Sequence, residues 1–208
     1  MSYLTFRNYM RQFLVFSIQD IKKAFPGFDT RRLVEWQQKG YLCKVINRWY
    51  AFTDVSEDGF SEEYLAYWTA NRIYAPSYLS LETALSHHGL IPEGVYTITS
   101  VSSRKTQTFN TPLGHFTYRR VKPALFFGYQ IIDWQGFPIR MADREKVILD
   151  YLYLNPHLRS SDDWEGLRLN ADTLGALNRT RLYDYLTLFA NRALEKRVDH
   201  LLNYLQRC

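Results

Sequence analysis

The first fifty residues carry apolar side chains at helical spacing in three successive groups. Residues 3–16 predict a first helix, because several apolar side chains fall on one helical face: Leu4, Met10, Phe13 and Leu14. Ser17, followed three residues later by Asp20, forms a capping-box pattern that predicts the start of a second helix. Pro26 and Gly27 end that helix, since proline cannot continue the hydrogen-bond ladder and glycine accepts the turn.

A third helix is predicted after this turn. Asp29 or Thr30 caps its start, because both residue types accept hydrogen bonds from the free backbone N–H groups of a first helical turn. Leu33 and Trp36 then face the core, and the helix ends near Gly40.

Beyond Gly40 the pattern changes to that of a hairpin. Residues 41–46 and 49–52 are rich in β-branched and aromatic side chains, and the turn between them is expected to place Asn47 in a left-handed conformation. Three helices and a hairpin form the plan of a winged helix-turn-helix, whose third helix enters the major groove of DNA. The candidate DNA contacts lie on the third helix and the wing: Thr30, Arg31, Arg32, Glu35, Gln38, Lys44 and Arg48.

Charge is distributed unevenly along the chain of 208 residues, whose net charge is +5. Residues 1–52 contain nine Lys or Arg against three Asp or Glu, whereas the rest of the chain is close to neutral. A compact basic module favours binding to a polyanion through counterion release. A solvated basic face without a partner is the alternative that composition leaves open.

The polar, acidic stretch at 53–59 predicts a domain boundary. We therefore expect a DNA-binding domain at 1–55, a connecting helix within 56–73 and a larger domain at 74–208. In the larger domain the patterns predict strands at 95–101, 114–121, 129–134 and 137–141, and helices at 142–154, 180–190 and 192–206. Strands followed by helices are typical of an α+β domain rather than a doubly wound parallel sheet.

Three segments of the larger domain carry a family resemblance. They are the stretch 74–91, the tripeptide 126–128 (Phe-Phe-Gly), and the motif 142–146 (Ala-Asp-Arg-Glu-Lys) with Asp150 and Tyr153. On these residues the chain resembles the AbiEi-type antitoxins of bacterial type IV toxin–antitoxin and phage-defence operons.

The resemblance implies a protein of two parts. Its N-terminal winged helix would bind inverted repeats in double-stranded DNA of its own promoter and repress the operon. Its larger α+β domain would neutralise a nucleotidyltransferase-like toxin encoded beside it, without a stable complex. Taken with the residues themselves, this leads us to expect a cytoplasmic protein that is not an enzyme.

Other groupings of polar residues point to competing functions. A second basic cluster, which is a candidate surface for nucleic acid or for the antitoxin activity, contains Arg104, Lys105, Arg119, Arg120 and Lys122. A metal-dependent nuclease site could be formed by residues such as Asp143, Glu145 and Lys146. Adjacent helical residues point about 100° apart, however, so the spacing of Glu145 and Lys146 fits such a site poorly. His87 and His88 are likewise adjacent and do not converge on a metal.

The sequence contains no glycine-rich phosphate-binding loop and no nucleophile elbow. Cys43 and Cys208 have no evident activating partner, and no apolar run or secretion signal indicates a membrane or an export route. We therefore expect neither a cofactor nor a metal. Two alternatives stay open: a nucleic-acid-cleaving or nucleic-acid-modifying enzyme targeted by a winged helix, and a transcription factor that senses a small molecule.

Overall fold

A computed structural model describes residues 1–54, 59 and 61–205. Within them the chain is mixed α/β, with ten α-helices and two sheets. The N-terminal module has three helices, α1 (Tyr3–Met10), α2 (Ile18–Ala24) and α3 (Arg31–Gln38). Its sheet is antiparallel, has the order β1-β3-β2, and is formed by β1 (Val15–Ser17), β2 (Leu42–Ile46) and β3 (Trp49–Phe52).

The prediction of one helix over 3–16 is wrong. Helix α1 ends at Met10, a single 3-10 turn spans Arg11–Phe13, and Leu14 has a φ of 57°, which an α-helix does not allow. The next three residues then pair with β3 as a strand. Pairing with a distant strand thus overrides the local helical spacing.

The hairpin tip also differs from the expectation. Arg48, not Asn47, has the positive φ, at 67°. A bulge between Lys44 and Ile46 shifts the register of β2 against β3, and the backbone carbonyl of Arg48 accepts a hydrogen bond from Ile18 N–H (2.9 Å). This bond to the start of α2 holds the second turn residue in place, so the left-handed residue is selected by tertiary contact rather than by residue type.

Aromatic side chains form the core of the module. Phe6 is fully buried, and its ring centroid lies 4.7 Å from that of Trp36 and 5.7 Å from that of Phe16. The predicted capping box is confirmed, because Ser17 Oγ accepts from Asp20 N–H and the Asp20 carboxylate accepts from Ser17 N–H. This core holds α3 with Leu33 and Trp36 inward and leaves its opposite face exposed.

Six strands form the sheet of the larger unit, in the order β6-β7-β5-β4-β9-β8. Their bounds are β4 (Ser77–Leu79), β5 (Thr97–Ser102), β6 (Gln107–Thr111), β7 (Gly114–Arg120), β8 (Tyr129–Trp134) and β9 (Phe137–Ala142). The pairs β5–β7 and β4–β9 are parallel and the other neighbours are antiparallel, so the sheet is mixed. Four of these strands match the predicted ones closely, whereas β4 and β6 were not predicted.

Seven helices accompany this sheet. Their bounds are α4 (Glu62–Ile73), α5 (Leu81–His87), α6 (Arg144–Leu154), α7 (Ser161–Gly166), α8 (Ala171–Gly175), α9 (Arg179–Phe189) and α10 (Arg192–Leu205). Helix α4 matches the connecting helix predicted within 56–73, and α6, α9 and α10 match the three predicted helices. The short helices α7 and α8 were not predicted.

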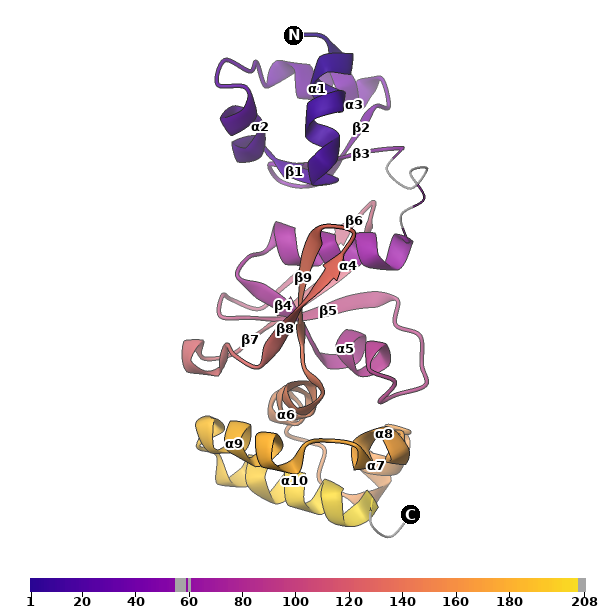
Figure 1. Cartoon of the computed structure of the whole chain (residues 1–208), viewed down its shortest axis with the longest axis vertical. Coiled ribbons are helices and arrows are strands. Elements are labelled where there is room, and N and C mark those ends of the chain that lie inside the picture. The colour runs from indigo at the N-terminus through magenta and orange to yellow at the C-terminus, as the bar shows by residue number, and fades with distance from the viewer. Residues whose placement is uncertain (55–58, 60, 206–208) are drawn as a thin grey trace.

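The elements stack along the long axis of the molecule (Figure 1). The N-terminal module occupies one end, α4 follows, then the sheet, then α5 and α6, and α9 and α10 close the other end. Helix α4 is more than a connector, because Leu65, Ala70 and Ile73 belong to the core of the larger unit. The predicted boundary at 53–59 lies mostly outside the described residues. No helix among the described residues has the length and the apolar run that crossing a membrane requires.

Candidate nucleic-acid interface

The exposed face of α3 brings together four of the seven predicted DNA contacts. Thr30, Arg31, Glu35 and Gln38 are all exposed, and the last three follow one another at helical spacing on the side opposite Leu33 and Trp36. The Arg32 side chain is half-buried instead, and its guanidinium donates to the backbone carbonyl of Met1. The helix thus presents a continuous polar stripe, beside which Arg32 is held by the N-terminal backbone.

Ion pairs on α3 hold its charged side chains in the free protein. The Arg31 guanidinium lies 2.9 Å from the carboxylate of Asp29, and Lys39 Nζ lies 2.7 Å from Glu35 Oε1. The hydrogen bond from Arg31 lowers the pKa of the Asp29 carboxyl. Because the Arg31 side chain is 91% exposed, water screens its pair with Asp29. Arg31 can therefore exchange this partner for an acceptor on a ligand.

The hairpin presents the two remaining predicted contacts. Lys44 on β2 and Arg48 at the tip are both exposed. Cys43, the residue before Lys44 in β2, is partly buried, and burial raises the pKa of its thiol, which makes it a poor nucleophile. Cys208 lies outside the described residues.

The second basic cluster does not form one patch. Arg119 and Arg120 follow one another in β7, so they point to opposite faces of the sheet. The Arg119 guanidinium donates to Leu154 O (2.9 Å), while Arg104 donates to Ala75 O (3.1 Å) and stacks on the Tyr74 ring. Three side chains of the cluster make no such contact and are exposed: Lys105, Arg120 and Lys122.

The acidic residues at the start of α6 serve the fold. Asp143 caps the helix through Lys146 N–H and also accepts from the Tyr185 hydroxyl (2.9 Å). Glu145 accepts from the backbone N–H of Asn178 (2.8 Å), at the start of α9. Burial raises the pKa of the Asp143 carboxyl. The described residues contain no group of His, Cys, Asp and Glu that could hold a metal ion.

A fully buried polar cluster that was not predicted from the sequence lies behind this motif. Asp150 accepts hydrogen bonds from Tyr78 Oη (2.8 Å), Ser80 Oγ (3.0 Å) and Lys146 Nζ, and neither Lys146 nor Asp150 has exposed side-chain area. Burial raises the pKa of Asp150 and lowers that of Lys146. Their spacing of four residues indicates that the two side chains can pair on one helical face, but it does not indicate that they are buried.

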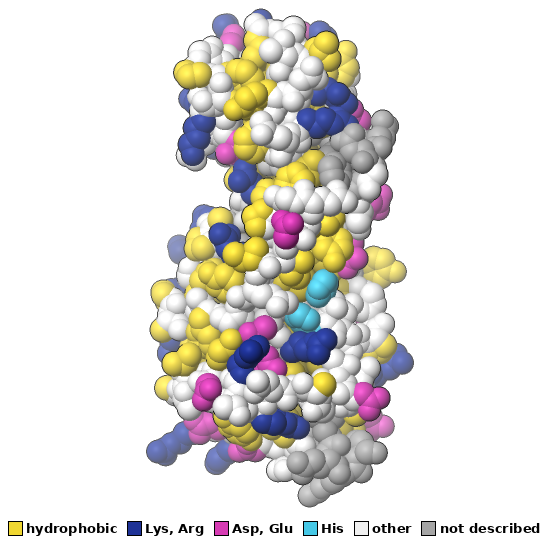
Figure 2. All heavy atoms as spheres, viewed as in Figure 1, with side chains coloured by type: hydrophobic (Ala, Val, Ile, Leu, Met, Phe, Trp, Pro, Cys, Tyr) yellow, Lys and Arg dark blue, Asp and Glu magenta, His cyan; other side chains and the backbone are white. Residues whose placement is uncertain are grey.

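Histidines and charges of both signs share one face of the larger unit (Figure 2). His88 Nε2 lies 2.8 Å from Ala142 O, and burial lowers the pKa of both His88 and His87. His115 is exposed and contacts Asn110 Oδ1. A local contact or partial burial therefore accounts for the position of each of these imidazoles.

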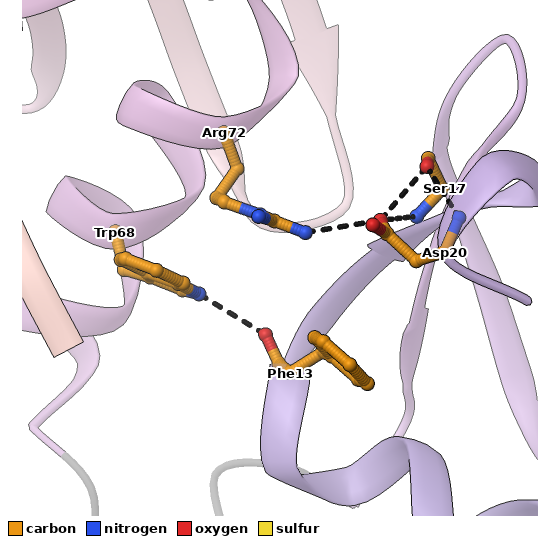
Figure 3. Close-up of polar contacts among 5 residues, drawn as sticks. All are labelled: Phe13, Ser17, Asp20, Trp68 and Arg72. Carbon is orange, nitrogen blue, oxygen red and sulfur yellow. Dashed lines mark hydrogen bonds and ion pairs between the residues drawn. The ribbon is translucent and has the colours of Figure 1, made fainter. Parts of the chain in front are cut away.

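Polar contacts join the N-terminal module to α4 (Figure 3). An Arg72 Nη atom lies 2.9 Å from Asp20 Oδ2, the atom that also closes the capping box with Ser17. Trp68 Nε1–H donates to Phe13 O (3.1 Å), and the Arg72 guanidinium lies over the rings of Trp68 and Trp49. The start of α2 is therefore anchored to the larger unit.

Arg72→Ala is expected to lower the free energy of unfolding by about 1–2 kcal/mol, because it removes a half-buried ion pair and two ring contacts. Urea unfolding of the full chain measures this loss. Arg140→Ala is the matched control, since Arg140 is exposed and lines, together with Arg72, one surface hollow between the module and the larger unit. Equal losses in the two variants would contradict a specific role for the Arg72 contacts.

Comparison with known proteins adds no relative. No family model matches the chain, and a search of curated proteins finds no match.

Proposed function

We propose that this protein is an antitoxin that represses its own operon. In this proposal the N-terminal module is a winged helix that binds inverted repeats in the double-stranded DNA of its promoter. Residues 74–208 neutralise a nucleotidyltransferase-like toxin encoded beside the protein, without forming a stable complex. The protein acts in the cytoplasm and is not an enzyme.

The observation that carries the DNA-binding proposal is the exposed polar stripe of α3 on a basic module. Arginine and glutamine match the acceptor and donor patterns of guanine and adenine in the major groove. Arg31 and Gln38 stand at the two ends of this stripe, about two helical turns apart. Both side chains can therefore reach base edges when α3 lies in the major groove.

The hairpin supports the same proposal. Lys44 on β2 and Arg48 at the hairpin tip are exposed cations of the same module, and in a winged helix this hairpin meets phosphates or the minor groove. Phosphate contacts of this kind add affinity for DNA of any sequence, whereas α3 supplies the preference for a particular DNA sequence.

Titration of the DNA upstream of the gene at several salt concentrations tests this proposal. We expect specific binding, and we expect the logarithm of the association constant to fall linearly with the logarithm of the salt concentration. Lys44→Ala should lower that slope by about one unit, because one phosphate contact and its released counterion are lost.

Arg168→Ala is the control for the salt slope. Arg168 is exposed and paired with Glu93 in the larger unit, and its removal should leave the slope unchanged. An unchanged slope in Lys44→Ala would remove the wing from the interface. Failure of the full protein to bind any duplex at low salt would refute the DNA-binding proposal.

The antitoxin proposal rests on the resemblance of segments 74–91, 126–128 and 142–146, and the structure brings parts of these segments into contact. Tyr78 from the first segment bonds to Asp150, Gly128 packs on Lys146, and Lys146 bonds to Asp150. Since this cluster is closed to solvent, it supports a shared domain core rather than a catalytic site.

Co-expression tests the antitoxin activity. Cells that express an adjacent nucleotidyltransferase-like gene should grow when the full protein is supplied from a second plasmid. Arg31→Ala should keep this rescue, because the proposal assigns neutralisation to residues 74–208. Absence of rescue by the wild-type protein would refute the antitoxin function while leaving the DNA titration unaffected.

A further inference from the structure

Arg197 occupies a position in α10 that the helix otherwise fills with apolar side chains. Leu194, Val198 and Leu201 are buried at the spacing of one amphipathic face. Arg197 lies three residues after Leu194 on that face and is only 7% exposed. An arginine keeps its charge at any ordinary pH, so its burial is unfavourable unless an anion compensates it.

No such anion comes from the described residues. Arg197 Nε is buried and makes no hydrogen bond, and none of the ion pairs among the described residues includes Arg197. Burial and the nearby positive charge of Arg159 both lower the pKa of Arg197. The fold therefore holds an uncompensated positive charge at a position where binding of an anion is favourable.

A hollow of about 480 Å³ lies over this guanidinium. It is lined by five residues: Arg159, Ala193, Lys196, Arg197 and His200. Three of them carry cationic side chains, and no carboxylate of the described residues contributes to the lining.

Contacts with neighbouring residues leave His200 and Arg159, which line the hollow, as hydrogen-bond donors. Trp164 Nε1–H donates to His200 Nδ1 (3.1 Å), so this ring nitrogen is occupied as an acceptor and Nε2 is the one that can donate. Arg159 Nε–H donates to Pro156 O (2.8 Å), which orients its guanidinium. The polar side chains that line the hollow can therefore donate hydrogen bonds, and none is left to accept one.

A positively charged hollow of donors is selective for an oxyanion. Phosphate offers several acceptor oxygens and the geometry that a guanidinium fork recognises. Helix α10 lies at the opposite end of the molecule from α3 (Figure 1), so a duplex held by the N-terminal module does not supply this anion. We propose that the hollow over Arg197 binds the phosphate group of a small ligand, either free phosphate or a nucleotide.

Calorimetric titration of the full chain with sodium phosphate and with ATP, at matched ionic strength in chloride, tests this proposal. We expect saturable binding of at least one probe, and tighter binding of ATP would identify a nucleotide as the source of the phosphate. Arg197→Met should weaken binding about tenfold or more, because it removes a charge-assisted hydrogen bond.

Two further variants make the result specific. Arg192→Met, which removes an exposed cation from the same helix outside the hollow, should bind as the wild type does. Lys196→Met removes a cation from the lining at an exposed position and should weaken binding even if Arg197→Met fails to fold. Thermal unfolding without ligand should show Arg197→Met at least as stable as the wild type, since an uncompensated buried charge is gone.

The proposal is overturned if neither phosphate nor ATP binds saturably. It is equally overturned if Arg192→Met weakens binding as much as Lys196→Met, because the effect would then be one of general charge. Binding of a single-stranded oligoribonucleotide without binding of either phosphate probe would assign the hollow to nucleic acid instead.

Discussion

Asp150→Ala is expected to lower the free energy of unfolding by about 3–5 kcal/mol, the largest effect among the single variants considered. The reason is the complete burial of its partner. Removing the carboxylate leaves the Lys146 ammonium without its anion and leaves the hydroxyls of Tyr78 and Ser80 without their acceptor. Urea unfolding of the full chain, followed by circular dichroism, measures the loss.

A double variant separates the pair from the packing around it. Lys146→Met combined with Asp150→Leu replaces both charges by apolar side chains and should recover much of the loss. Glu35→Gln breaks an exposed pair of the same spacing and should leave the unfolding midpoint nearly unchanged. A loss below about 1 kcal/mol in Asp150→Ala would contradict the view that this cluster is dry and tightly coupled.

Gly128 belongs to the same structural unit. Its φ is +70°, and a Cβ atom placed on it would lie 2.9 Å from two carbon atoms of the Lys146 side chain. A side chain there would both strain the backbone and push on the buried lysine. This close approach explains why the tripeptide 126–128 ends in glycine.

Arg31→Ala is expected to weaken binding to the specific promoter site about tenfold to a hundredfold, and to reduce the preference for one base. Arg31 is the cation of the α3 stripe, and its pair with Asp29 is open to water. Competition titrations against duplexes changed at single positions measure both quantities.

Arg31→Lys is the informative control. It keeps the charge but loses the planar fork, so it should retain non-specific affinity and lose base preference. An equal loss on every duplex in Arg31→Ala would place this side chain on a phosphate. Gln38→Ala, about two helical turns farther along the same stripe, should alter preference at a different base position.

Elements with strong local signals were predictable from the sequence. The capping box of Ser17 and Asp20, the helix α4 and the hairpin of β8 and β9 depend on residues within a few positions of one another. Local patterns also placed Thr30, Arg31 and Gln38 on one exposed face, since burial of Leu33 and Trp36 turns the opposite face outward.

Other elements depend on partners that are distant in the chain. Strand β4 has only three residues and exists because β5 and β9 pair with both of its edges. Strand β6 is mostly polar and is an edge strand, so it carries little hydrophobic alternation. The segment 3–16 shows the converse case, where helical spacing is present but pairing of Val15 with Ala51 makes a strand.

The buried charges were decided by the tertiary structure alone. In sequence, Lys146 and Asp150 resemble an ordinary surface pair, and Arg197 resembles one more cation on a basic helix. Packing of α6 against its neighbours removes the first two from water, and packing of α10 does the same for the third. Burial raises the energetic importance of a charge because water no longer screens it, and only the assembled fold excludes the water.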